Sequence, residues 1–236
     1  MSIQLSRRKI WLAVLSVAAI ALFLLLVPPL HQDQSYHGFA DRRTILGVSN
    51  FWDVISNLPF AVVGLMGLFA FRDLPSRIIF LGIFATAFGS AYYHLRPDNA
   101  RLFWDRLPMT VVFMSLFALA IKQRPLVIPL VIIGAASVVW WRLTDNLWPY
   151  ALVQFGPMVA LIVIAFRSEP RLRPVVVLYG LSKITEFFDQ QIYAVFPLSG
   201  HTLKHLLAGV ATWYVFRWIQ SLPESQTGLA SAPAES

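Results

Sequence analysis

Two histidines near the end of the chain have a spacing that suits the binding of one metal ion. His201 and His205 form an H-x-x-x-H pattern, and an i, i+4 spacing places both imidazoles on the same face of a helix. The chain contains no cysteine, so a metal must be held by His, Asp or Glu side chains. The pattern alone is not specific, because a single histidine in a membrane helix more often hydrogen-bonds to a neighbouring helix.

A third histidine and two oxygen-bearing side chains extend this pattern toward hydrolytic chemistry. His94 offers another imidazole, and Ser90 lies four residues before it, on the same helical face. Asp105 follows His94 across a short turn, so two antiparallel neighbouring helices would bring them close. Three histidines, an open position for water and a carboxylate that takes its proton are the groups of a catalytic zinc site. Alternatively, Asp105 forms an ion pair with Arg106, and Ser90 is only a small packing residue.

The composition places these residues in a membrane protein. Hydrophobic residues make up 57% of the 236 residues and charged residues only 13%, whereas soluble domains carry roughly 25% charged residues. This excludes a disordered chain, an ordinary cytosolic enzyme and a nucleic-acid-binding protein. Eight stretches are apolar and long enough to cross a bilayer core of ~30 Å: 10–30, 51–71, 78–95, 103–121, 125–141, 148–166, 174–194 and 200–220. The sequence therefore predicts an all-α, polytopic membrane helical bundle.

The predicted spans divide the chain into three parts. Residues 1–49 form an N-terminal signal-anchor helix and an outer loop, residues 50–220 form a seven-helix membrane domain, and residues 221–236 form a disordered cytoplasmic tail. Basic residues near the helix ends favour one side by more than two to one, which predicts that both termini are cytoplasmic. The signal anchor and the compact loops are typical of a bacterial inner-membrane protein. In this orientation the candidate site lies toward the outer face.

Other polar residues inside the predicted spans are functional candidates, because ionisable groups are costly in a membrane. The span 174–194 contains Lys183, Glu186 and Asp189. These three residues form either a structural ion pair or a lining that meets a lipid head group. The span 51–71 opens with Asp53, Ser56 and Asn57, which we expect to cap and wet the outer end of their helix. His31 and His37 fall in the first outer loop, where we expect no chemical role for them.

Three motifs resemble those of the alkaline ceramidase family. They are Gly89-Ser90-Ala91-Tyr92-Tyr93-His94, then Asp105-Arg106-Leu107-Pro108-Met109, and finally His201-Thr202-Leu203-Lys204-His205. The opening of the second span, from Asn50 to Asn57, is also similar to the start of that family. The family belongs to a superfamily of seven-helix membrane hydrolases that includes the progestin and adipoQ receptors. The resemblance covers the predicted spans from 51 to 220, so the first helix is an addition to the seven.

This resemblance implies both a metal site and a reaction. It implies that His94, His201 and His205 bind zinc, that Asp105 holds and deprotonates the catalytic water, and that Ser90 helps to stabilise the oxyanion. It also implies a zinc-dependent amide hydrolase that cleaves the N-acyl bond of a ceramide, giving a fatty acid and a sphingoid base. The partner is then a membrane lipid, either ceramide or another N-acyl lipid, and not a nucleic acid.

One part of the family pattern differs. Animal members carry a calcium site just before the second span, but here only Asp41 and Asn50 offer suitable oxygen ligands. Calcium prefers six to eight oxygens, so the sequence argues against a calcium ion. Asp41, Arg42 and Arg43 are expected to form a salt-bridged cap over the outer opening instead.

Two other functions compete with lipid hydrolysis. A receptor-like or scaffolding membrane protein would keep the zinc site for structure, and a transporter would use the charged span 174–194 as an ion path. The sequence shows no inverted repeat and predicts no pair of broken helices, which disfavours a transporter.

Overall fold

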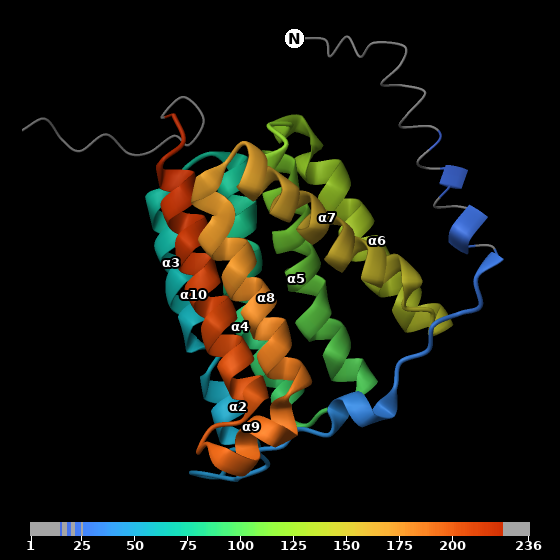
Figure 1. The fold of residues 1–236 in the computed structure, drawn as a ribbon, viewed down its shortest axis with the longest axis vertical. Helices are drawn as coiled ribbons and strands as arrows, with labels where there is room; N and C mark the ends of the chain where they lie inside the picture. Colours follow the sequence, from blue (N-terminus) through green and yellow to red (C-terminus); the bar gives the residue numbers. More distant parts are fainter. Residues whose placement is uncertain (1–14, 16–17, 20–21, 25, 224–236) are drawn as a thin grey trace, which may run out of the picture.

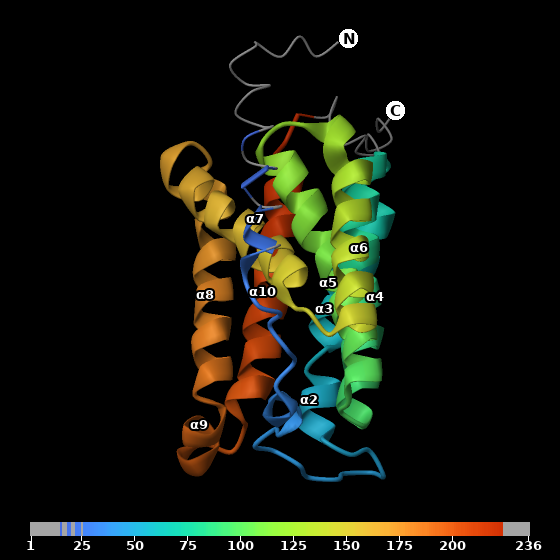
Figure 2. The ribbon, with the colours of Figure 1, turned by 90° about the vertical axis from the view of Figure 1, so that its right-hand side faces the viewer.

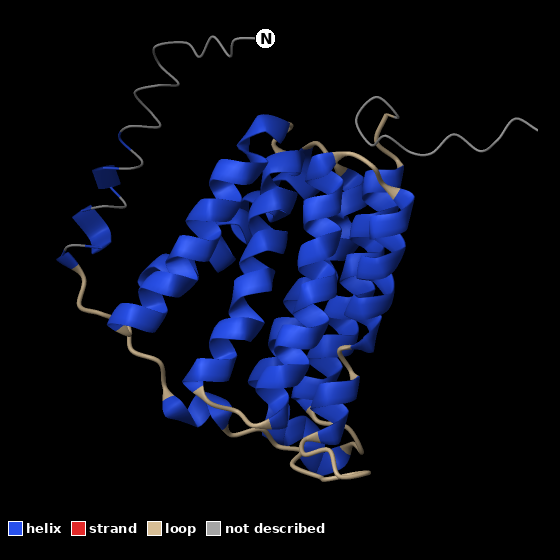
Figure 3. Ribbon diagram, turned by 180° about the vertical axis from the view of Figure 1, so that it is seen from behind, coloured by secondary structure: helices blue, strands red, loops and turns tan. Residues whose placement is uncertain are grey.

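The protein is an all-helical bundle, which confirms the predicted fold class. The computed structural model describes residues 15, 18–19, 22–24 and 26–223, and within them there are nine α-helices and no β-strand (Figure 1 and Figure 3). About half of the predicted signal-anchor span 10–30 and most of the predicted tail lie outside the described residues.

The helices follow one another through short connections. Their bounds are α2 (Phe51–Ile55), α3 (Leu58–Ala70), α4 (Leu74–Leu95), α5 (Asn99–Ala120), α6 (Val127–Thr144), α7 (Trp148–Arg167), α8 (Arg173–Phe187), α9 (Asp189–Val195) and α10 (Gly200–Gln220). Three of these starts have a local cause, because the side chains of Asp73, Asp98 and Ser199 accept hydrogen bonds from free N–H groups in the first turns of α4, α5 and α10.

Five helices are long and apolar enough to cross a membrane, which indicates a multi-pass membrane protein. They cover Phe51–Ala70, Leu74–Leu95, Asn99–Ala120, Arg124–Thr144 and Trp148–Arg167, close to five of the predicted spans. The last two predicted spans are not among these five. Helix α8 has only 15 residues, and α10 carries His201, Lys204 and His205 in its first turns, which lower its hydropathy.

Two helices that the sequence predicts to be continuous are interrupted. Ser56 and Asn57 separate α2 from α3, and Phe188 separates α8 from α9. Both interruptions lie toward the same end of the bundle, where α2 and α9 are found at the bottom of Figure 1. The expectation that the chain lacks broken helices is therefore wrong, and both breaks lie near the candidate site.

The bundle packs α4 against α3 and α5, and α10 against α3 and α8 (Figure 2). Its hydrophobic core includes stacked rings of Phe71 and Phe80, with the ring of Phe216 from α10 edge-on to both. Helices α4 and α10 both pack on α3, and their side chains meet across the interior, as Phe80 and Phe216 do in the core and His94 and His201 do at the site. The last turn of α4 therefore faces the first turns of α10, although these turns are more than a hundred residues apart in the sequence.

The segment from residue 27 to residue 50 runs across the end of the bundle where α2 and α9 lie (Figure 1 and Figure 2). The two histidines of this segment have structural partners. His31 Nδ1 lies 3.0 Å from Asp145 Oδ2, and the ring nitrogens of His37 lie 2.8 Å from Tyr93 Oη and 2.9 Å from Asn99 Oδ1. These contacts hold the segment against the ends of α4, α5 and α6.

Candidate metal centre

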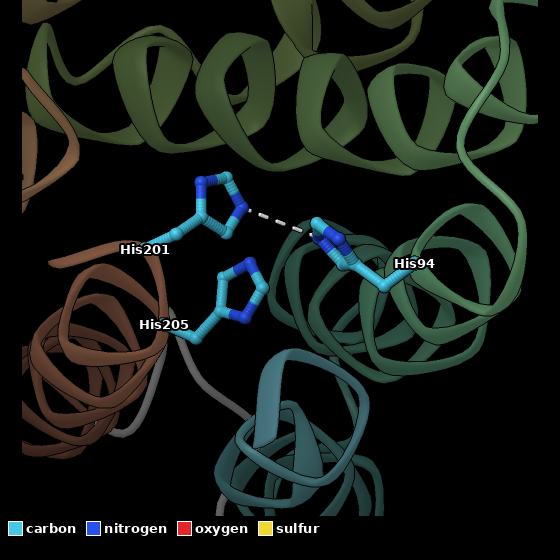
Figure 4. Close-up of side chains that lie close together, drawn as sticks. All are labelled: His94, His201 and His205. Carbon is cyan, nitrogen blue, oxygen red and sulfur yellow. Dashed lines mark hydrogen bonds between the residues drawn. The ribbon is translucent and has the colours of Figure 1, made fainter. Parts of the chain in front are cut away.

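The three predicted histidines come together in the interior of the bundle. His94 lies in the last turn of α4, and His201 and His205 lie in the first turns of α10. Their rings point toward one another (Figure 4), and one ring nitrogen from each lies within 4.8 Å of the others. The three residues are only 1%, 3% and 3% exposed, respectively. They form a group that can hold a metal ion.

The spacing of two nitrogens fits a shared metal ion. The Nε2 atoms of His94 and His201 are 3.3 Å apart. Two nitrogens that bind one tetrahedral zinc at ~2.0–2.1 Å are separated by ~3.3–3.4 Å. Neutral imidazole also suits copper, iron and nickel, so the donor set indicates a transition metal without selecting one.

His205 is oriented by two groups, one in the short helix α2 and one directly after it. Its Nδ1 lies 3.1 Å from the backbone oxygen of Asp53 and 2.9 Å from Ser56 Oγ. A carbonyl oxygen can only accept a hydrogen bond, so Nδ1 carries the proton and the lone pair of Nε2 is free for a metal. Such contacts from neighbouring groups normally fix the tautomer and angle of a metal-binding histidine.

The start of the span 51–71 therefore differs from the prediction. Asp53, Ser56 and Asn57 are buried rather than wetting the end of a helix. The Asp53 carboxylate accepts hydrogen bonds from Thr202 Oγ1 at 2.6 Å and from Ser199 Oγ at 3.3 Å, which fastens α2 to the start of α10. The sequence contained a signal for this, since three polar residues so close together inside a membrane span need partners.

Phe39, from the segment before α2, covers two of the three imidazoles, those of His94 and His201. Its buried ring has its centroid 4.6 Å from that of His94 and 4.4 Å from that of His201. Asp189 holds this cover to α10, because its two carboxylate oxygens accept hydrogen bonds from the backbone N–H groups of His201 and Ala40. No sequence pattern distinguishes Phe39 from the other 17 phenylalanines of the chain.

Ser90 and Asp105, the two predicted catalytic side chains, are brought to the same cavity as His205. This apolar cavity has a volume of about 110 Å³ and is lined mainly by hydrophobic side chains from α3, α4, α5, α7, α8 and α10. Gly89 allows the close approach of α4 and α5 at this level, because a Cβ atom there would lie 2.1 Å from the backbone oxygen of Trp104. The predicted proximity of these two helices is confirmed.

A second cavity, the polar chamber, adjoins the first. It has a volume of about 220 Å³, and its polar lining comprises Tyr36, Asp105, Arg106, Tyr150, Gln154, Lys183, Glu186 and Lys204. Glu186 forms ion pairs with Lys183 at 2.7 Å and with Lys204 at 2.5 Å. The two interpretations of the charged span 174–194 are therefore compatible, since Lys183 and Glu186 form an ion pair and also line a cavity. Asp189 belongs instead to the cover over the histidines.

Asp105 and Arg106 do not form the ion pair considered as an alternative. Among the salt bridges of the described residues, none includes Arg106. Its Nη2 atom donates to the Gln32 side-chain oxygen at 2.7 Å. The two side chains are therefore free to act separately.

The loop before α2 contains an ion pair between Asp41 and Arg43, two of the three residues predicted to form a salt-bridged cap. Asp41 accepts hydrogen bonds from the Arg43 side chain at 2.9 and 2.5 Å, whereas Arg42 donates to the backbone oxygen of Phe39. Burial raises the pKa of the Asp41 carboxyl, but the hydrogen bonds and charge of Arg43 lower it below its ordinary value overall. The Asn50 side chain donates to the backbone oxygen of His94, so both oxygen-bearing residues considered for calcium contact other protein groups.

Comparison with known proteins adds no relative. The chain matches no protein-family model and no curated protein. A functional assignment therefore depends on the geometry of the site and on the resemblance of the three motifs.

Proposed function

We propose that the protein is a zinc-dependent integral membrane amidase that hydrolyses the N-acyl bond of a ceramide-like lipid to a fatty acid and an amine. One observation carries this proposal. Three buried imidazoles meet in the bundle, and one of them, His205, lines an otherwise apolar cavity together with Ser90 and Asp105. An acyl chain matches such a lining, and hydrolytic groups at its end match the position of an amide carbonyl.

The histidines supply the ligands, and the other side chains supply proton transfer and charge stabilisation. His94, His201 and His205 would hold the ion, which when bound lowers the pKa of a water molecule and polarises a carbonyl. Asp105 takes the proton of the attacking water and returns it to the leaving nitrogen. The Ser90 hydroxyl donates a hydrogen bond to the oxygen that becomes negatively charged.

The cavity is suited to an acyl chain by its length as well as its chemistry. Its lining on α5 extends from Asp105 to Leu116, which is ~16 Å at 1.5 Å per residue. The lining on α10 extends in parallel from Lys204 to Val215. The distribution of basic residues supports an orientation in which the site faces the outer side of a bacterial inner membrane and both termini are cytoplasmic.

The proposal is tested by metal analysis combined with hydrolysis of a panel of N-acyl lipids. His94→Ala and His205→Ala are expected to abolish release of fatty acid and to lower the bound zinc. Ser90→Ala should keep zinc and lose about 10²–10³-fold in kcat, the usual cost of one oxyanion donor. The control is His31→Ala, because His31 is exposed and contacts Asp145. Full activity of a metal-free preparation would contradict the proposal.

A receptor-like or scaffolding protein with a structural metal remains the second candidate. The observation that favours it is the nearly complete burial of the histidines under Phe39, since structural zinc sites are closed. Asp105→Asn separates the two functions. A hydrolase should lose activity while it keeps its zinc, whereas a receptor-like protein should show no change in the lipid composition of the membrane.

A further inference from the structure

The apolar cavity and the polar chamber share the residues that lie between them. Asp105, Met109, Lys183 and Lys204 line both cavities. A lipid whose amide lies beside Asp105 can therefore extend its acyl chain into the apolar cavity and its head group into the polar chamber. A single water needs only ~10–15 Å³, so a chamber of about 220 Å³ has room for a head group of several atoms.

The charges that line the polar chamber are not balanced. Arg106, Lys183 and Lys204 carry positive charge, against the carboxylates of Asp105 and Glu186. Both lysines are ion-paired with Glu186. Arg106 makes no ion pair within the described part of the chain, and it is only 6% exposed. A buried cation without a counter-charge is costly, so an anion that enters the chamber would be stabilised there.

Arg106 is also held in one place by its neighbours. Its guanidinium carbon lies 4.3 Å from the ring centre of Trp141, 4.7 Å from that of Tyr150 and 5.7 Å from that of Tyr36. The Nη2 atom donates to Gln32, but the buried Nη1 atom has no hydrogen-bond partner. A guanidinium is suited to oxyanions, because its planar N–H groups can bind two oxygens at once.

We propose that the polar chamber binds an anionic head group through Arg106, so that the substrates of this protein are N-acyl lipids whose head group carries a carboxylate or a phosphate. This inference rests on the proposed amidase function and narrows its substrate class. A neutral ceramide would leave Arg106 without a counter-charge, whereas an acidic head group would supply one. Lys183 and Lys204 would add to the attraction, because they line the same chamber.

The first experiment compares two lipids that differ only in charge. N-palmitoylserine carries a carboxylate where N-palmitoylserinol carries a hydroxymethyl group. Wild-type protein should prefer N-palmitoylserine by about tenfold or more in kcat/KM, which is the usual value of one charge-assisted hydrogen bond. N-palmitoyl-phosphoethanolamine and N-palmitoylethanolamine form a second matched pair and show whether a phosphate or a carboxylate is favoured.

Variants of the chamber should remove the preference. Arg106→Gln is expected to bring the two rates within about threefold of each other, chiefly by raising KM for the acidic lipid, and Arg106→Lys should restore part of the difference. Lys183→Gln offers a second variant if Arg106→Gln does not fold, because it leaves the Glu186–Lys204 pair in place. The matched control is Arg101→Gln, on the same helix, where Arg101 pairs with Asp98 outside the chamber.

Binding separates this proposal from the hydrolase proposal. The His94→Ala protein keeps all residues of the chamber, so its affinity for the two lipids can be measured without turnover. Tighter binding of N-palmitoylserine, lost on addition of Arg106→Gln, would support the head-group site even if no lipid were hydrolysed. Equal binding of both lipids would overturn it. Competition by inorganic phosphate, with no preference between the lipids, would also overturn it in favour of a free-anion site.

Discussion

The contact between Ser56 and His205 allows a direct test of how the metal centre is built. Ser56 Oγ lies 2.9 Å from His205 Nδ1, and the backbone oxygen of Asp53 lies 3.1 Å from the same nitrogen. Ser56→Ala removes one of these two contacts and leaves the three histidines in place. We therefore expect a weaker zinc site rather than a lost one.

The size of the effect follows from the contacts that remain. Loss of a group that orients a metal ligand typically costs 10–100-fold in metal affinity. The Asp53 carbonyl still holds Nδ1–H in Ser56→Ala, so the loss should be near the lower limit. We predict an increase of about tenfold in the Kd for zinc, which corresponds to ~1.4 kcal/mol.

The assay is a competition titration of the purified protein with a chromophoric zinc chelator. Ser137→Ala is the matched control, because Ser137 is also buried but its hydroxyl donates to the Gly134 backbone oxygen on α6. An unchanged zinc affinity in Ser56→Ala, or an equal loss in Ser137→Ala, would refute the role of Ser56 in orienting His205.

Two further predictions concern stability. Gly89→Ala should lower the free energy of unfolding by about 1–3 kcal/mol, and with it the Tm, because its Cβ would lie 2.1 Å from the Trp104 backbone oxygen. Gly156→Ala, with no atom within 4 Å of its Cβ, should leave the Tm unchanged or raise it. The pKa of the Asp41 carboxyl is lowered beside Arg43. This pair therefore stabilises the protein at pH values above 3.8, the ordinary pKa of an aspartate, and the stabilisation disappears as the pH falls through the folded-state pKa. The Tm of the wild type should therefore fall more than that of Asp41→Asn between about pH 5 and about pH 3, and parallel curves would contradict the role of the pair.

The sequence by itself determined the helical class and the three imidazoles. A low charge content and long apolar runs leave helices as the structures that satisfy the backbone in a membrane, and an i, i+4 spacing places His201 and His205 on one face whatever surrounds them. The short turn before α5 likewise brought Asp105 close to the end of α4. The helical class, the shared face of His201 and His205 and the nearness of Asp105 to α4 depend on residues that are near one another in the chain, whereas the meeting of His94 with the other two imidazoles depends on how the helices pack.

Only the tertiary structure decided what surrounds the imidazoles. Asp53 and Ser56 contact His205 across about 150 residues of sequence, and Phe39 covers the site from a loop that has no periodic pattern. The division into an apolar cavity and a polar chamber depends on how α5, α8 and α10 pack together. The position of Arg106 among aromatic rings depends on how α5 meets α6, α7 and the segment before α2. Periodicity shows which face of a helix is polar, but it does not show which distant group that face will meet, because this is set by side-chain packing between helices.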